Sequence, residues 1–237
     1  MTPIRIACIG YGKMGRSVEA LALERGHRVV ARIQRPTAGA ERPLSREMLG
    51  DADVAIEFSV PQSAVANALA CVDAGVPVVV GTTGWYEELP RVRDAVRQGQ
   101  GALFYAPNFS PGVAVFAAIA ARAAAILAED TEFDAHLVET HHAAKRDAPS
   151  GTARMLRDAM TAQRPGEIPV TSVRVGSVPG THEIIFDAPF EQIRLVHEAR
   201  DRRLFAAGAL RAAAWLIGRV GIFTMDDMLQ LTGGPRT

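Results

Sequence analysis

The densest group of chemically reactive residues runs from Glu139 to Thr152 and reads Glu-Thr-His-His-Ala-Ala-Lys-Arg-Asp-Ala-Pro-Ser-Gly-Thr. An imidazole exchanges its proton near neutral pH, so His141 can act as a proton donor or acceptor. Lys145 adds a full positive charge a few residues later. A metal site is not indicated, because no cysteine lies nearby and the spacing differs from that of zinc sites. The alternative is a polar loop whose histidines are satisfied by hydrogen bonds.

The end of this segment has the features of an anion site. Pro149 and Ser150 precede a helical run that starts near Ala153. The backbone N–H groups of Gly151 and Thr152 should therefore lie at a helix N-terminus, where they can bind a carboxylate. One loop thus combines an anion site, a cation and a proton donor.

A second motif, near the start of the chain, contains three glycines. Gly10, Tyr11, Gly12, Lys13, Met14 and Gly15 fit the pattern G-x-G-x-x-G, with a predicted strand before them and a helix after them. The first glycine permits a tight turn, the second lets the backbone approach a pyrophosphate, and the third lets the helix pack against the strand. The motif predicts dinucleotide binding; a glycine turn that arose by chance is the alternative.

The residues after the second predicted strand bear on the choice of dinucleotide. An acid that binds the ribose is expected about 20 residues after the glycine motif, but the strand ends with Ile33, Gln34 and Arg35. Arg35 can bind a 2′-phosphate, with Arg32 as a helper. We therefore expect NADPH as the preferred cofactor and NADH as a possible one. The alternative is that both arginines are solvated surface residues.

The first part of the chain alternates between strands and helices. Helices are predicted over 13–25, 62–74 and 89–98, and strands over 4–9, 29–33, 53–58, 77–80 and 102–105. This alternation is typical of an α/β fold with a Rossmann-type doubly wound parallel sheet, whose ligand lies at the carboxyl ends of the strands.

The pattern changes after Asn108. A helix is predicted from Ser110 and Pro111 to about Ala128, a second over 152–162, and strands over 136–140, 170–175, 181–187 and 192–199. Such a strand-rich region predicts a second α+β domain on a mixed or antiparallel sheet. We expect a dinucleotide-binding domain over 1–109, completed by 206–237 with a helix over 204–218, and a substrate-binding and oligomerisation domain over 110–205. The glycine motif and the histidine segment should then face one crevice.

Composition excludes several classes of partner. Lysine plus arginine number 26, and aspartate plus glutamate also number 26, so no general attraction to nucleic acid or to anionic membranes is expected. The longest apolar stretch, 112–128, is interrupted by Arg122, and the N-terminus lacks the pattern of a signal peptide. We expect a cytoplasmic protein with two reduced cysteines, Cys8 and Cys71.

The segment from Glu139 to Ala153 resembles the signature E-x-H-H-x-x-K-x-D-A-P-S-G-T-A of the 4-hydroxy-tetrahydrodipicolinate reductase family, also called dihydrodipicolinate reductases, of lysine and diaminopimelate biosynthesis. The resemblance covers essentially the whole chain, and further similar segments are 10–15, 81–84, 106–110 and 205–215. It departs from the family at Glu57, where an aspartate is frequent, and at Gln34, where an acid is frequent.

The resemblance implies a role for each matching residue. His141 would donate or accept a proton, and Lys145 would be a second proton donor. His142 would contact a small dicarboxylate substrate, whose carboxylate Gly151 and Thr152 would bind. The glycine motif would bind the NAD(P)H phosphates. The nicotinamide and its ribose would lie next to Gly81, Thr82, Thr83, Ala106, Pro107, Asn108 and Phe109. The family also implies a homotetramer joined through the sheets of the second domain.

Two other functions fit parts of the pattern. One is a similar two-domain reductase of another small acid or semialdehyde, and the other is a dinucleotide-binding sensor without catalysis. A semialdehyde dehydrogenase that forms an acyl-enzyme would need a cysteine nucleophile in its cleft. Cys8 and Cys71 lie in a predicted strand and a predicted helix. A sensor would leave the His141–Lys145 cluster without a use.

Overall fold

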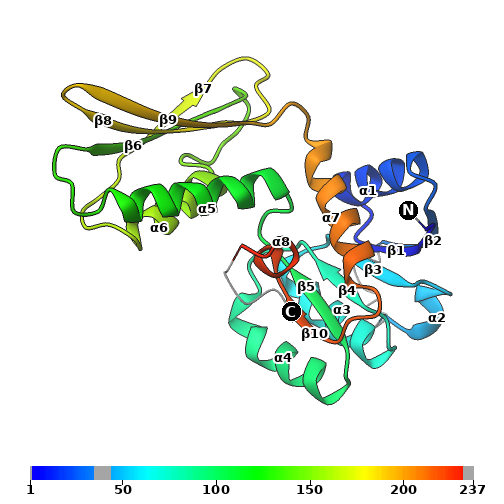
Figure 1. Ribbon diagram of the computed structural model, residues 1–237. Coiled ribbons are helices and arrows are strands. Elements are labelled where there is room, and N and C mark those ends of the chain that lie inside the picture. Colours follow the sequence, from blue (N-terminus) through cyan, green and yellow to red (C-terminus); the bar gives the residue numbers. More distant parts are fainter. Residues whose placement is uncertain (1, 35–43, 232–237) are drawn as a thin grey trace. The chain divides into compact units, whose positions relative to one another are not determined.

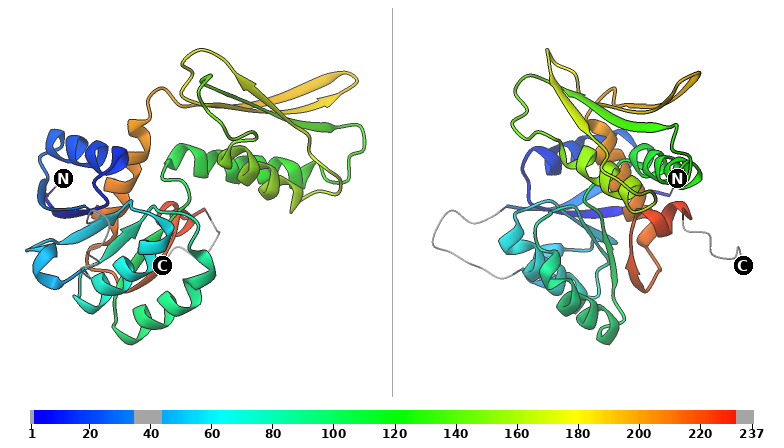
Figure 2. Two further views of the ribbon diagram at one scale, coloured as in Figure 1. Left: turned by 180° about the vertical axis from the view of Figure 1, so that it is seen from behind. Right: turned by 90° about the vertical axis from the view of Figure 1, so that its left-hand side faces the viewer.

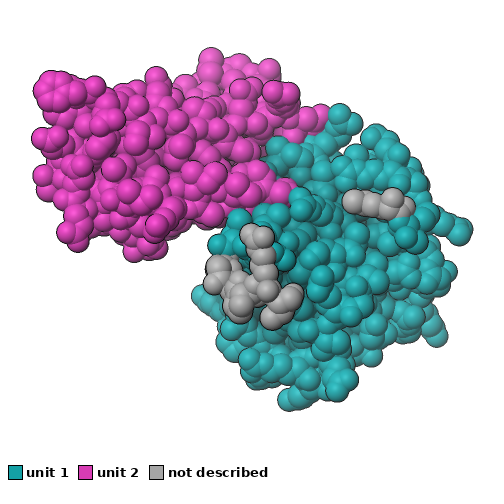
Figure 3. Space-filling model, in the orientation of Figure 1, with its two compact units in different colours: residues 1–110, 203–237 teal, residues 111–202 magenta. Residues whose placement is uncertain are grey.

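The computed structural model describes residues 2–34 and 44–231, and the chain forms two compact units (Figure 1). Unit 1 comprises Met1–Ser110 and Arg203–Thr237, and unit 2 comprises Pro111–Arg202 (Figure 3). The sequence predicts these boundaries after 109 and after 205, a few residues from those in the structure. None of the helices formed by the described residues is both long and apolar enough to span a membrane.

Unit 1 is built on a six-stranded sheet with the order β10-β5-β4-β3-β1-β2, in which all neighbours are parallel. The buried strands are short apolar runs, as expected when helices cover both faces of a parallel sheet. The strands are β1 (Arg5–Ile9), β2 (Arg28–Ile33), β3 (Val54–Glu57), β4 (Val78–Val80), β5 (Ala102–Tyr105) and β10 (Gly221–Phe223).

Two layers of helices cover this sheet (Figure 1). On one face, α1 (Lys13–Glu24) packs beside α7 (Arg203–Leu216), and α7 also contacts β3, β4 and β5. On the other face, α3 (Pro61–Asp73) packs beside α4 (Leu89–Gln98), and their apolar residues form one core with those of the strands. This arrangement confirms the predicted Rossmann-type fold.

Unit 2 contains a four-stranded sheet with the order β7-β6-β8-β9. The pair β6–β7 is parallel and the other pairs are antiparallel, so the sheet is mixed, as predicted. Its strands are β6 (Asp134–His141), β7 (Val170–Arg174), β8 (Thr181–Ala188) and β9 (Glu191–Glu198). The two helices α5 (Pro111–Ile126) and α6 (Gly151–Thr161) pack against each other and against the sheet, around a core that includes Leu137, Leu156 and Phe186 (Figure 2).

Several short elements escaped the sequence prediction. They are α2 (Arg46–Leu49), a 3₁₀ helix at Tyr86–Glu88, the edge strand β10 and α8 (Met225–Leu229). Elements of three to five residues carry too few positions for a periodic pattern to identify them. One local signal did exist, because Thr224 and Asp227 form a capping box at the start of α8.

Candidate active site

The glycine loop joins β1 to α1 in unit 1. Gly10 has a φ of 83°, and a Cβ there would lie 2.2 Å from the carbonyl oxygen of Phe58. A Cβ on Gly15 would lie 2.4 Å from the carbonyl oxygen of Gly10. A Cβ on Gly12 would meet nothing within 4 Å among the described residues. Packing therefore requires two of these glycines, and the third leaves an open side that fits the close approach of a phosphate.

The first turn of α1 supplies the donors for such a phosphate. Gly12 is the N-cap, with φ −84° and no side chain to cap the helix, and the helix begins at Lys13. The N–H groups of Lys13, Met14 and Gly15 have no partner within the helix and carry its positive dipole end. The residues present thus fit a dinucleotide pyrophosphate, as the sequence predicts.

The loops after β3, β4 and β5 lie along one edge of the same sheet, because these strands are parallel neighbours. The hydroxyl of Thr82 accepts a hydrogen bond of 2.8 Å from the N–H of Ser59. A Cβ on Gly81 would lie 2.0 Å from the ring of Phe58, which in turn meets the ring of Phe109 edge to face at 5.7 Å. The segments 81–83 and 106–109 are therefore held together through the loop that follows β3.

A buried carboxylate that sequence reasoning did not place in the site supports this edge. Glu57 is fully buried at the end of β3. One of its oxygens accepts hydrogen bonds from the hydroxyl and the N–H of Ser59, the latter at 3.1 Å, and from the Asn67 amide at 3.3 Å. The other oxygen is buried without a described partner. An acidic residue that ends an apolar strand was the available signal.

The outer end of the predicted dinucleotide site contains an ion pair. Arg32 of β2 donates from Nε to the carboxylate of Glu19 at 2.6 Å, and the hydroxyl of Tyr11 donates to the same carboxylate. Glu19 is buried and Arg32 is half-exposed. Arg32 is thus already paired, which does not favour its predicted role as a helper at a 2′-phosphate. Arg35, the main predicted contact, lies outside the described residues.

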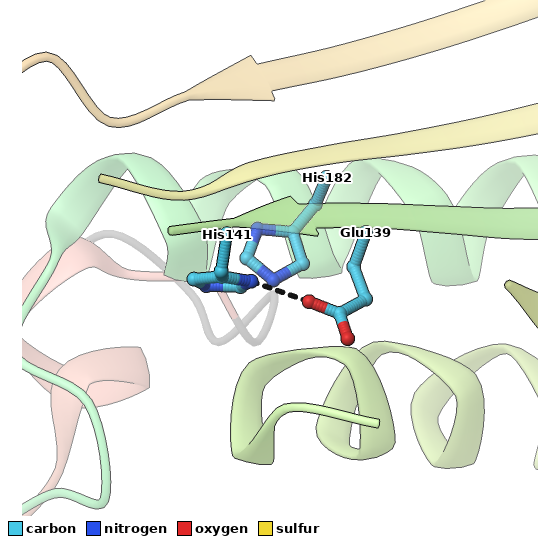
Figure 4. Close-up of side chains that lie close together, drawn as sticks. All are labelled: Glu139, His141 and His182. Carbon is cyan, nitrogen blue, oxygen red and sulfur yellow. Dashed lines mark hydrogen bonds and ion pairs between the residues drawn. The ribbon is translucent and has the colours of Figure 1, made fainter. Parts of the chain in front are cut away.

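In unit 2, three titratable side chains from two strands converge (Figure 4). Glu139 and His141 point inward from β6, and His182 points inward from β8, where it is the cross-strand partner of Glu139. Nδ1 of His141 forms a short hydrogen bond with Oε2 of Glu139. The rings of His141 and His182 meet edge to face at 5.3 Å. All three residues are buried.

Glu139 also receives charged and backbone donors. Nη2 of Arg174 donates to its Oε1 at 2.6 Å, and the N–H of Ser150 reaches the same oxygen at 3.3 Å. Arg174 is the register partner of His141 in the parallel pair β6–β7. The same guanidinium donates to the carbonyl of Asp147 at 2.6 Å. The last part of the loop after β6, at Asp147 and Ser150, is therefore attached to this ion pair.

The N-terminus of α6 completes this loop. The hydroxyl of Ser150 accepts a hydrogen bond of 3.1 Å from the N–H of Ala153, and it lies 3.3 Å from Nε2 of His182. Gly151 is exposed, and a Cβ there would meet nothing within 4 Å among the described residues. The carboxylate site expected at Gly151 and Thr152 would lie at this helix N-terminus, where the helix dipole attracts anions.

Lys145 and His142 belong to the same loop. The ammonium group of Lys145 forms an ion pair with Asp147 at 2.7 Å, and its side chain is 22% exposed. The N–H of Lys145 donates to the carbonyl of His142, whose side chain is half-buried. Lys145 thus retains access to solvent while Asp147 holds it in the loop.

Burial and hydrogen bonds shift the pKa values of Glu139, His141 and His182 by different amounts. Burial alone would raise the pKa of Glu139, but hydrogen bonds from Arg174, Ser172 and His141 outweigh it and lower the value to about 2. Burial lowers the pKa of His141, although Glu139 opposes this shift. Burial, with His141 nearby, lowers the pKa of His182 to about 4. At neutral pH Glu139 is therefore an anion and His182 is neutral.

The same three side chains are of types that bind metal ions. One ligand-type atom from each of Glu139, His141 and His182 lies within 4.8 Å of the others. Their hydrogen bonds, and the guanidinium of Arg174 on Glu139, account for the arrangement without an ion. The sequence prediction that no metal is bound stays a prediction.

The predicted site residues thus fall into two groups, each within one unit. The glycine loop and the segments 81–83 and 106–109 belong to unit 1, and His141, His142, Lys145, Gly151 and Thr152 belong to unit 2. Sequence reasoning missed Glu139, Arg174 and His182 as parts of the second group. The alternation of a strand places Glu139 on the face of His141, but the contacts of Arg174 and His182 depend on strand register.

The two cysteines are poor candidates for a nucleophile. Cys8 lies in β1 and Cys71 in α3, and both are buried. Burial raises the pKa of each thiol to about 12. A thiol in such surroundings stays protonated and inert, which argues against a dehydrogenase that forms an acyl-enzyme.

Fold and side chains together define a class of two-unit proteins, with a Rossmann-type sheet in one unit and a cluster of buried titratable groups in an α+β unit. Family models described as "Dihydrodipicolinate reductase, N-terminus" and "Dihydrodipicolinate reductase, C-terminus" match residues 4–109 and 112–229. The chain belongs to the dihydrodipicolinate reductase family.

Individual relatives agree with this family. The chain is 35% identical over 240 residues to a 4-hydroxy-tetrahydrodipicolinate reductase of Christiangramia forsetii, covering 95% of this chain and 98% of that protein. It is 42% identical over 185 residues to one of Haloarcula marismortui, covering 71% and 72%. The structure of a dipicolinate-bound dihydrodipicolinate reductase from Paenisporosarcina sp. has the same fold, with a TM-score of 0.80 at 23% identity, covering 95% of this chain and 99% of that one.

Proposed function

We propose that this chain reduces the dehydrated form of 4-hydroxy-tetrahydrodipicolinate to tetrahydrodipicolinate with NAD(P)H, a step of lysine and diaminopimelate biosynthesis. The observation that carries the proposal is the loop of unit 2. It combines the buried Glu139–His141 pair, the partly exposed cation of Lys145 and the N-terminus of α6, where Gly151 is exposed. A reductase of a small dicarboxylate needs a proton donor and an anion site, and this loop supplies both.

Unit 1 would hold the cofactor. The N–H groups after Gly12 would bind the pyrophosphate, and the segments 81–83 and 106–109 would border the nicotinamide and its ribose. When bound, the reduced nicotinamide supplies a hydride. Because Arg32 is paired with Glu19, a preference for NADPH would depend on Arg35. Arg35→Ala should then weaken NADPH binding more than NADH binding, and an equal loss for both would reject that role.

Unit 2 would hold the substrate. One carboxylate would accept hydrogen bonds from the N–H groups of Gly151 and Thr152, and His142 and Lys145 would contact the rest of the molecule. Because the reductase from Paenisporosarcina sp. is dipicolinate-bound, a small aromatic dicarboxylate is a suitable probe. Hydride transfer requires the nicotinamide and the substrate to meet. That their two sites face one crevice stays a prediction from the sequence.

The chemistry then needs one proton. The hydride adds to a ring carbon conjugated with the imine, and the displaced electron pair moves onto the neighbouring carbon or nitrogen. A proton from Nε2 of His141 or from Nζ of Lys145 would neutralise it. General acid catalysis of this kind contributes roughly 10²–10⁴-fold to the rate. His182, neutral at physiological pH, is not a source of this proton.

The test is direct. Protein is mixed with NADPH and freshly generated 4-hydroxy-tetrahydrodipicolinate, and the absorbance of the reduced nicotinamide is followed. We expect it to decrease only when protein and substrate are both present. A rate no greater than that without protein would reject the reductase function. It would favour the non-catalytic sensor if NADPH still binds.

The outer face of the sheet in unit 2 would join subunits. Val173 and Val196 are exposed there, and Val138 and Ile185 are half-buried, whereas the contacts of α5 and α6 are with the inner face. We expect a homotetramer formed through this face in a cytoplasmic enzyme. Val196→Glu should lower the mass measured by light scattering, and an unchanged mass would place the interface elsewhere.

A further inference from the structure

Glu139 occupies an unusual position in unit 2, because its carboxylate is fully buried and has several donors. Nδ1 of His141 bonds one oxygen, and Arg174 and the N–H of Ser150 bond the other. The hydroxyl of Ser172 also donates to this carboxylate. The donors come from three segments, namely β6, β7 and the start of α6. One side chain therefore links the candidate proton donor to the candidate anion site.

The carboxylate of Glu139 determines which ring nitrogen of His141 carries the hydrogen. An ionised carboxylate can only accept hydrogen bonds, so the Nδ1 atom of His141 that meets Glu139 must carry a hydrogen. In the neutral ring the other nitrogen, Nε2, then has the lone pair. Nε2 is therefore the atom that takes up and releases a proton.

The absence of a side chain at Gly180 leaves room for the same ring. Gly180 has a φ of 152°, and a Cβ there would lie 2.9 Å from Nε2 of His141 and 3.2 Å from its Cδ2. A residue with a side chain would push the ring away from this place. The bare backbone at Gly180 thus leaves room for the ring in the orientation in which Nδ1 meets Glu139.

We propose that Glu139 is a positioning residue that holds His141 in the tautomer protonated on Nδ1, with Nε2 as the proton-exchanging atom, and that fixes the N-terminus of α6 through the N–H of Ser150. The expected effect on turnover rests on the proposed reductase function. The assignment of the tautomer does not depend on that function. Glu139 touches neither substrate nor cofactor in this assignment. Its effect on turnover passes through His141.

The decisive substitution is Glu139→Gln. Glutamine keeps the size of the side chain, but its amide offers both an acceptor oxygen and a donor nitrogen. Arg174 requires the acceptor, which turns the amide nitrogen toward Nδ1 of His141. The neutral ring can then accept that hydrogen bond only by moving its proton to Nε2. We expect the other tautomer to predominate in this variant.

Glu183→Gln is the matched control. Glu183 lies in β8 of the same sheet and is next in sequence to His182, so its side chain points to the opposite face, where it pairs with Arg194. The chemical change is the same, but it leaves the contacts of Glu139 intact. This variant should keep the wild-type tautomer, kcat and KM.

The measurement is the pair of ring-nitrogen chemical shifts of His141 in nitrogen-labelled protein without ligands, assigned among the 6 histidines with a His141→Asn variant. Wild type should show the Nδ1–H tautomer, and Glu139→Gln should show the Nε2–H tautomer. In the absorbance assay, Glu139→Gln should lower kcat by roughly 10²–10⁴-fold with the KM for NADPH within about twofold.

Three results would overturn the proposal. They are an Nε2–H tautomer in the wild-type protein, an unchanged tautomer in Glu139→Gln, or a changed tautomer with full kcat. The wild-type spectrum needs no substitution, so it tests the assignment even if the variant does not fold. Absence of wild-type turnover would reject the proposed function and leave the tautomer result standing.

Discussion

The glycine loop permits a prediction that separates packing from ligand binding within one motif. Gly12→Ala adds a methyl group where no described atom lies within 4 Å, at a backbone φ of −84° that alanine adopts freely. Alanine is a poorer N-cap than glycine by about 0.5–1 kcal/mol. It also restricts the unfolded chain, which offsets about 0.4–1 kcal/mol. The free energy of unfolding should therefore change by less than about 1 kcal/mol.

Cofactor binding should respond differently. The new methyl group would occupy the side from which a phosphate approaches the N–H groups of α1. Loss of one charge-assisted hydrogen bond costs about 1.5–3 kcal/mol. This corresponds to an NADPH dissociation constant about 10- to 150-fold larger. Titration calorimetry with NADPH and urea denaturation monitored by circular dichroism would measure the two quantities on the same preparation.

Gly10→Ala is the comparison variant. Its Cβ would lie 2.2 Å from the carbonyl oxygen of Phe58, and φ is 83°. Left-handed strain and overpacking together should lower the free energy of unfolding by roughly 2–6 kcal/mol. If Gly12→Ala bound NADPH as tightly as wild type, or if it lost as much stability as Gly10→Ala, the assignment of the phosphate site to this loop would be wrong.

Three further predictions concern unit 2. Lys145→Ala should lower kcat by roughly 10²–10⁴-fold and leave the NADPH dissociation constant unchanged in calorimetry; a large loss of NADPH affinity would contradict its place in the substrate site. The pKa of His182 falls from 6.5 to about 4 on folding, so its contribution of about 3 kcal/mol is present above pH ~6.5 and is lost as the pH falls toward ~4. Urea denaturation of His182→Gln should therefore show a flatter pH dependence between these values than wild type, and an identical slope would refute the shift. Leu156→Ala removes a fully buried side chain and should lower the free energy of unfolding by about 2–5 kcal/mol in the same assay; a loss below about 1 kcal/mol would mean that the core adapts to the cavity.

The longer elements could be predicted because their patterns are local. The helix from Leu89 to Gln98 and the strand from Ala102 to Tyr105 have the bounds that periodicity predicts. The glycine after α1, Gly26, has a φ of 77°, as a helix-ending residue should. The strand β10 could not be found in this way, because Gly221–Phe223 is stabilised by pairing with β5 and not by its own pattern.

The site could be predicted only as far as its residues lie in one segment. His141, Lys145 and the Gly151–Thr152 helix start are neighbours in sequence, so the types of residue alone indicate the chemistry. Arg174 reaches the same site through the parallel register of β6 and β7, which no local pattern encodes. The Arg32–Glu19 pair likewise depends on how β2 meets α1.

Both units use a buried acidic side chain to hold the loop that follows a strand. Glu57 ends β3 and accepts the N–H of Ser59, and Glu139, near the end of β6, accepts the N–H of Ser150. The loop after β6 is polar and offers little apolar surface to bury, whereas the loop after β3 also packs the ring of Phe58 on that of Phe109. A buried charge is costly unless it is satisfied, and a carboxylate with several donors holds a backbone more specifically than a methyl group can. The cost of burying this charge is consistent with a need for the N–H groups and side chains of these loops to keep one geometry even without a ligand. Glutamine at position 139 would keep the volume and lose the charge, so a stability loss without a shape change is the expected signature of this arrangement.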